Sequence, residues 1–157
     1  MAFCHTYHAS MEPIPEAAFV ELQELYRRLA VELEPLRRHC DSRGVCCQFS
    51  KCGHMLYLTD LEAVEMTRSG VAPDAAQAEA GTCPYLRGHL CGIRDNRAIG
   101  CRLYYCDRTY DDDRNALCEK YLKQAREIEA RYNVEHRYRP VTQIDFKEFA
   151  AHEQKVV

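Results

Sequence analysis

Long apolar runs and an excess of positive charge are both missing from this sequence of 157 residues. No apolar run approaches the roughly 18 residues that a membrane-spanning helix needs. Lys and Arg number 21 against 24 Asp and Glu, which gives a net charge of −3 at pH 7. A nucleic-acid-binding or polybasic membrane-binding surface requires a basic excess, so we expect neither partner, and a protein partner stays open. The length and the hydrophobic fraction of 46% are those of a single globular domain, residues 1–157.

The first residues lack the basic segment and the apolar segment of a secretory signal. We therefore expect a cytoplasmic protein, in a compartment where thiols stay reduced and disulfides rarely persist. A disulfide-linked scaffold would require export by another route. Residues 1–12 are expected to form a loose N-terminus in which Cys4 is a bystander.

Familiar catalytic motifs are absent as well. The sequence contains no Gly-rich phosphate-binding loop, no G-x-S-x-G and no H-E-x-x-H. No catalytic residue is therefore assigned, and whether the protein is an enzyme stays open.

Cysteine is abundant, with ten residues in the chain. Eight of them fall within residues 40–106, which also contain many glycines and no periodic apolar face: Cys40, Cys46, Cys47, Cys52, Cys83, Cys91, Cys101 and Cys106. Because buried packing cysteines belong on apolar faces, a metal or iron–sulfur site explains this group better. Cys118 differs, since it lies near the apolar face of a predicted helix and is expected to pack in the core.

The cysteine spacing matches no familiar metal site. The gaps include C-x5-C-C, C-x7-C, C-x9-C and C-x4-C, without a C-x2-C zinc knuckle, a ferredoxin pattern or a haem-attachment motif. Thiolates bind zinc, iron–sulfur clusters and copper(I). Eight thiols would serve two four-ligand sites, or one such site with spare cysteines.

Apolar residues at steps of three and four predict two long helices. The first begins at about Pro15 and ends near Pro35, and the second covers about residues 113–133. Thr59 and Glu62 form a capping box, which predicts a helix from about Asp60 to Ser69.

Shorter elements are predicted between and after these helices. Residues 55–58 form either a strand or the lead-in to a helix, and residues 71–82 a linker or a weak helical turn. Short strands are allowed around Leu90 and Ile93, and residues 141–149 add a short helix capped at Thr142 or Asp145. The predicted fold is mainly α, with a few helices supporting an irregular cysteine-rich loop centre, residues 40–106.

Cationic residues accompany the cysteines. Guanidinium groups beside thiolates would stabilise an anionic cluster, and the alternative is that they are solvated loop residues. The arginines concerned are Arg87, Arg94, Arg97, Arg102 and Arg108. Three histidines near cysteines are further candidate ligands, or else surface residues: His39, His54 and His89.

Five pieces of the sequence, in this order, resemble the CxxCxxCC, or YkgJ-type, cysteine-cluster family. The pieces are Cys40-x-x-Arg-Gly-Val-Cys46-Cys47, Cys83-Pro-Tyr-Leu, Leu90-Cys91-Gly-Ile93, Arg97-Ala-Ile-Gly-Cys101 and Arg102-Leu-Tyr-Tyr-Cys106-Asp107. Members of this family are described as zinc- or iron-chelating, and flagellin lysine N-methylases carry a related domain. The family's second cysteine is Arg43 here, unless Cys52 replaces it, and Ala98 stands where the family has proline.

The resemblance implies a set of ligands for the metal or cofactor: Cys40, Cys46, Cys47, Cys83, Cys91, Cys101 and Cys106. It favours an iron–sulfur cluster of the four-iron type, because seven thiols exceed the needs of one zinc ion. The cluster's role would be structural, electron-transferring or, following the methylases, methyl-transferring. The alternatives are a zinc-stabilised interaction module and a thiol redox sensor that reacts first at Cys46 and Cys47.

Overall fold

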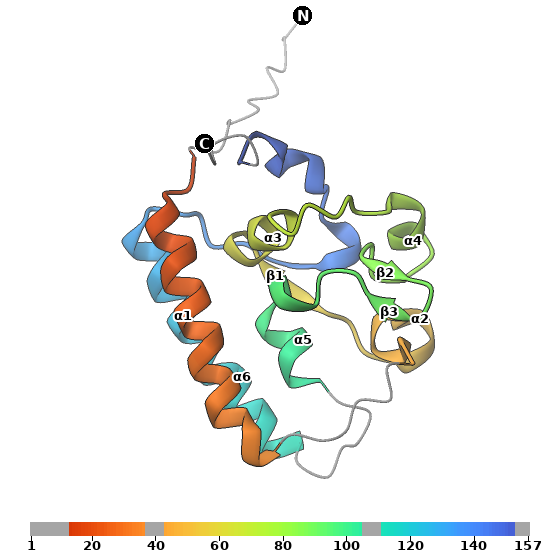
Figure 1. The fold of residues 1–157 in the computed structure, drawn as a ribbon, viewed down its shortest axis with the longest axis horizontal. Coiled ribbons are helices and arrows are strands. Elements are labelled where there is room, and N and C mark those ends of the chain that lie inside the picture. Colours follow the sequence, from red (N-terminus) through yellow and green to blue (C-terminus); the bar gives the residue numbers. More distant parts are fainter. Residues whose placement is uncertain (1–12, 37–42, 105–110, 153–157) are drawn as a thin grey trace, which may run out of the picture.

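Two long helices lie side by side along one edge of the molecule (Figure 1). The computed structural model describes residues 13–36, 43–104 and 111–152. Helix α1 (Glu16–Leu33) and helix α6 (Asp111–Arg131) confirm the two predicted long helices. After Leu33 the chain tightens into the short 3-10 helix η1 (Glu34–Leu36), where Pro35 removes a backbone donor. The predicted N-terminus, residues 1–12, lies outside the described residues.

Acidic residues of α1 link it to α6 near both ends. Glu32 accepts hydrogen bonds from the Lys120 ammonium at 2.7 Å and from the Tyr121 hydroxyl at 2.9 Å. At the other end Glu21 accepts one from the Tyr132 hydroxyl at 2.8 Å. These contacts fix the register of the two helices, while their apolar faces supply the core between them.

Helix α3 (Asp60–Thr67) runs through the interior, and all eight of its residues are buried. The predicted capping box is confirmed: the Thr59 hydroxyl accepts from the Glu62 amide, and the Glu62 carboxylate accepts from the Thr59 amide at 3.0 Å. The helix ends two residues earlier than Ser69, the predicted end. A helix this polar is buried because its carboxylates have partners.

The C-terminal part of the chain supplies partners for two buried carboxylates, Asp60 of α3 and Glu129 of α6. Asp60, 1% exposed, accepts from the Arg137 Nε at 2.5 Å and the Arg139 Nη2 at 2.8 Å. Glu129 of α6 is fully buried, and its carboxylate lies 2.6 Å from the His136 Nδ1. Charged hydrogen bonds of this kind are needed to offset the desolvation of a buried carboxylate.

Four short strands form two antiparallel pairs. Strand β1 (Tyr57–Thr59) pairs with β4 (Tyr138–Pro140), and β2 (Leu86–Arg87) with β3 (Leu90–Cys91). The strand predicted near Leu90 is confirmed, but Ile93 lies outside it, and β4 was not predicted.

The remaining elements are short. They comprise α2 (Phe49–Cys52), α4 (Ala75–Glu79), α5 (Ile99–Leu103), and the 3-10 helices η2 (Val45–Cys47), η3 (Arg94–Asn96), η4 (Val141–Gln143) and η5 (Phe146–His152). Helix α4 confirms the predicted helical turn, whereas the tail forms 3-10 turns rather than an α-helix. The fold is mainly α, as predicted. Within the described residues, no helix has the length and apolar character needed to cross a membrane.

Candidate functional site

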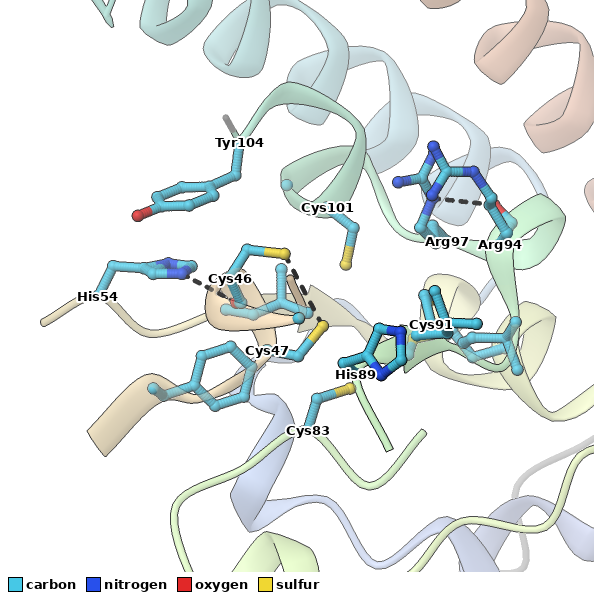
Figure 2. A pocket seen from close by; sticks show the side chains of 17 residues that line it. Cys46, Cys47, His54, Cys83, His89, Cys91, Arg94, Arg97, Cys101 and Tyr104 are labelled. Atoms are coloured by element: carbon cyan, nitrogen blue, oxygen red, sulfur yellow. Dashed lines mark hydrogen bonds between the residues drawn. The ribbon is translucent and has the colours of Figure 1, made fainter. Parts of the chain in front are cut away.

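Five cysteines line one cavity of about 70 Å³. They come from four segments of the chain, namely η2, the turn before β2, strand β3 and helix α5: Cys46, Cys47, Cys83, Cys91 and Cys101. Figure 2 shows their side chains gathered in the middle of the site. All five are free thiols. The structure thus brings together the five predicted ligands that lie among the described residues.

A close approach of two backbone segments brings η2, which carries Cys46 and Cys47, against the β2–β3 hairpin, which carries Cys91. Gly44 has a left-handed φ of 66°, and a Cβ added there would lie 2.8 Å from the carbonyl oxygen of His89. Glycine is therefore the residue that fits between η2 and the β2–β3 hairpin. The amide of Cys83 also donates to the carbonyl of Cys47 at 2.7 Å, which holds these two cysteines side by side.

Helix α3 positions the helix that carries Cys101. The carboxylate of Glu62 accepts a hydrogen bond from the Ile99 amide at 2.8 Å, in the first turn of α5. On the other face, a Cβ added at Gly100 would lie 2.8 Å from the Leu56 side chain, so α5 sits tightly against the core. The buried capping carboxylate of α3 therefore also orients a wall of the cavity.

The thiols oppose one another's ionisation. The Cys46 and Cys47 sulfurs lie 3.9 Å apart, and this hydrogen bond, together with burial, raises the pKa of Cys46 well above its usual range. The same contact lowers the pKa of Cys47, but its hydrogen bond to Cys83 and burial outweigh this and raise it to about 12. Burial, followed by the neighbouring Cys47, raises the pKa of Cys101. Without a cation, these thiols stay protonated at neutral pH.

Two histidines and two arginines complete the polar lining. The His54 ring stacks on Tyr104 with 3.8 Å between ring centroids, and its Nε2 lies 3.0 Å from the Cys46 carbonyl oxygen. Figure 2 shows His54 and Tyr104 on one side of the cysteines and Arg94 and Arg97 on the other. His89, at the hairpin tip, lines the cavity too.

Several predicted candidates lie elsewhere. Cys52 is not among the cavity-lining residues, and its sulfur faces the Phe49 carbonyl at 4.0 Å. Arg43, at the position where the family has a cysteine, is exposed. Cys118 is partly buried and packs against the hydrophobic core, as predicted. The candidates outside the described residues are His39, Cys40, Cys106 and Arg108, and Cys4, the expected bystander, lies outside them too.

The arginines divide into two groups. Arg94 and Arg97 line the cavity, whereas Arg87 donates to the carbonyls of Pro84 and Leu86. Arg102 lies over the Tyr26 ring, 4.2 Å from its centroid. Arg102 therefore stabilises the core side of α5 rather than the thiols.

Sequence reasoning missed two residues that shape the site. Glu62 was assigned only to the capping box, and its bond to Ile99 depends on a tertiary contact that sequence does not show. Tyr104, stacked on His54, had no signal beyond its place between two cysteines.

The donor set suits a soft or borderline metal, since it consists of thiols and imidazoles. Two sulfurs on one tetrahedral zinc ion lie roughly 3.8 Å apart, as follows from Zn–S bonds of about 2.3 Å, close to the 3.9 Å between Cys46 and Cys47. Among the described residues, however, no group of three or more Cys, His, Asp or Glu side chains is arranged to hold a metal ion. Coordination by three of these five thiols would therefore require them to move closer together.

No family model matches this chain, and neither a curated protein nor a solved structure shows significant similarity to it. The resemblance to the CxxCxxCC, or YkgJ-type, family therefore stays a prediction.

Proposed function

We propose that this chain is a cytoplasmic metal-binding protein that holds iron, as an iron–sulfur cluster of the four-iron type, through its clustered cysteines. The observation that carries this proposal is the arrangement of five free thiols from four segments around one cavity. Cys83 lies in the hydrophobic core and Cys47, Cys91 and Cys101 pack against it, but packing alone does not predict that thiols from four segments line the same cavity. Cys40 and Cys106 belong to the proposed ligands through the family resemblance alone.

When bound, such a cluster supplies either a structural link between the four segments or a one-electron carrier. The chain's own part is to supply thiolates, to exclude water with apolar walls, and to hold the ligand loops against the helices. The apolar walls include Phe49, Leu56 and Met66. A methyl-transfer role follows only from the related methylase domain and has no residue in the cavity assigned to it.

A zinc-stabilised interaction module is the second candidate. The 3.9 Å between the Cys46 and Cys47 sulfurs favours it, because both could bind one tetrahedral ion without a large rearrangement. Zinc has no redox chemistry, so the protein would then act through its surface.

A thiol redox sensor is a weaker candidate. Such a sensor needs an exposed thiol with a lowered pKa. Cys46 and Cys47 are only partly exposed, and their pKa values are raised. These two properties slow the first oxidation step.

Anaerobic purification followed by a visible spectrum and analysis for iron, zinc and acid-labile sulfide tests these proposals. Iron and sulfide in similar amounts with a broad visible absorption support the cluster, and zinc with a featureless spectrum supports the second candidate. Protein that contains neither metal after anaerobic purification and reconstitution contradicts both.

Matched cysteine variants then test the site. Cys91→Ser and Cys101→Ser are expected to lose most of the bound metal, because each removes a thiol from the cavity. Cys52→Ser is the control, since that thiol lies outside the cavity-lining set. Equal metal loss in Cys52→Ser would show that the ligand assignment is wrong.

A further inference from the structure

The permanently charged side chains in the described lining of the cavity are all positive. Among the described residues that line it, Arg94 and Arg97 carry permanent positive charge, and none is an Asp or Glu. The chain as a whole is acidic, with a net charge of −3, so this lining departs from the average surface.

The charges balance once the thiols are ligands. A divalent ion held by four thiolates has an excess of two negative charges, and a four-thiolate cluster is likewise an anion. Two guanidinium groups at the edge of the cavity would cancel that excess in a setting where water is partly excluded. The two arginines thus fit the metal-loaded site better than the metal-free one.

Hydrogen bonds on its side chain and its backbone fix the position of Arg97. Its Nε donates to the Arg94 carbonyl at 2.9 Å, and its own carbonyl accepts from the Arg102 Nε at 2.8 Å. Arg97 is partly buried, whereas Arg94 is exposed.

We propose that Arg97, assisted by Arg94, is the positioning residue whose fixed charge offsets the negative charge of the metal-loaded cavity and thereby raises its metal affinity. This inference rests on the proposed function. It distinguishes two arginines of the five near the cysteines, because Arg94 and Arg97 line the cavity. Arg87 and Arg102 are not among the lining residues, and Arg108 lies outside the described residues.

The test is an anaerobic titration of the full-length, metal-free protein with Co²⁺, followed through thiolate-to-cobalt charge-transfer absorption. Arg97→Gln is expected to weaken Co²⁺ binding by about 10- to 100-fold, the range typical of residues that support metal ligands. Arg94→Gln should weaken it by only about threefold, because the more exposed charge is better screened. Lys51→Gln is the matched control, since it removes one exposed positive charge outside the lining and should leave the affinity unchanged.

Arg97→Lys separates charge from local structure, because it keeps the charge and loses the guanidinium hydrogen bond to Arg94. An affinity within about threefold of the wild-type value supports the electrostatic role. An Arg97→Lys affinity as low as that of Arg97→Gln, or equal affinities of Arg97→Gln and wild type, would overturn the inference. Failure of the wild-type protein to bind Co²⁺ would also overturn the inference. The proposed function is tested separately, by the metal content after anaerobic purification.

Discussion

The helical part of the molecule, formed by α1, α3 and α6, and the cysteine cavity differ in how their buried polar groups find partners. In the helical part, each buried carboxylate of α3 and α6 has a donor: Asp60 has two arginines, Glu62 two backbone amides, Glu65 the Asn96 side chain and Glu129 a histidine. In the cavity, thiols face other thiols, and these contacts together with burial raise the pKa values of Cys46 and Cys47. The helical part is complete as a folded unit, whereas the cavity gains a strong stabilising interaction only when a cation enters.

Metal removal is expected to have the largest effect and to separate the two parts. Stripping the loaded protein with a chelator should lower hydrogen-exchange protection in residues 43–47 and 83–104 by on the order of 100-fold or more, because coordination energy is folding energy for loops that hold a metal. The amides of α1 and α6 should keep their protection. An equal loss of hydrogen-exchange protection in the cavity segments and in α1 and α6 would show that the two parts unfold as one cooperative unit. The helical part would then not be stable independently of the cavity.

The second prediction breaks the helical part instead. Asp60→Asn removes the short carboxylate contacts of Arg137 and Arg139, which keep longer contacts with Glu148 at 3.9 and 3.7 Å. The side chains of the two arginines are 33% and 24% exposed. Because both arginines retain some contact with water, we expect a loss of about 3 kcal/mol in the free energy of unfolding, at the lower end for a broken buried ion pair. Denaturant unfolding followed by circular dichroism measures this loss.

Asp112→Asn is the control for this change, since Asp112 is exposed in the first turn of α6. The metal content of folded Asp60→Asn should match the wild type. A destabilisation below about 0.5 kcal/mol, which is ordinary for a surface change, would mean that the Asp60 pairs contribute no net stability.

Sequence patterns predicted the helical part better than the cavity. Helices α1, α3 and α6 were identified because their apolar faces or caps are local signals. Helix α5 was interpreted as irregular because a five-residue helix is too short to show a period. Strand β4 was missed because its pairing with β1 joins residues 138–140 to residues 57–59, and no local pattern reports such a contact.

The sequence predicted that the cysteines form a metal or cluster site, but it left open whether they form one site or two, and it did not predict their arrangement. Which five of them share a cavity depends on the close approach of Gly44 to the His89 carbonyl and on the bond from Ile99 to Glu62. Both are tertiary contacts between segments far apart in the chain. The family resemblance implied a ligand set with Cys52 as a possible replacement for the cysteine missing at position 43, and Cys52 is not among the residues that line the cavity.

The third prediction disturbs the cavity while sparing the helices. Gly44→Ala places a methyl group 2.8 Å from the His89 carbonyl oxygen and adds a side chain at a φ of 66°. We expect a loss of about 2 kcal/mol from the clash and the backbone strain, together with weaker metal retention. Gly53→Ala is the matched control, because Gly53 has a φ of 71° but nothing within 4 Å of the added Cβ. Equal effects of the two variants would show that strain alone matters and that the backbone approach does not shape the cavity.

The smallest effect is expected at the surface of the helical part, where α1 and α6 meet. Lys120→Gln removes an ion pair with Glu32 in which the side chains are 50% and 41% exposed, so the free energy of unfolding should fall by no more than about 0.5 kcal/mol. Tyr121→Phe removes the hydrogen bond from a nearly buried phenol to the same carboxylate and should cost about 1 kcal/mol. The order of these two losses, measured by denaturant unfolding, tests whether the helical part owes its stability to buried partners rather than to surface charge. If Lys120→Gln lowers the free energy of unfolding more than Tyr121→Phe does, the exposed ion pair is the stronger link between α1 and α6. The helical part would then differ from the cavity in its apolar packing and not in its buried polar partners.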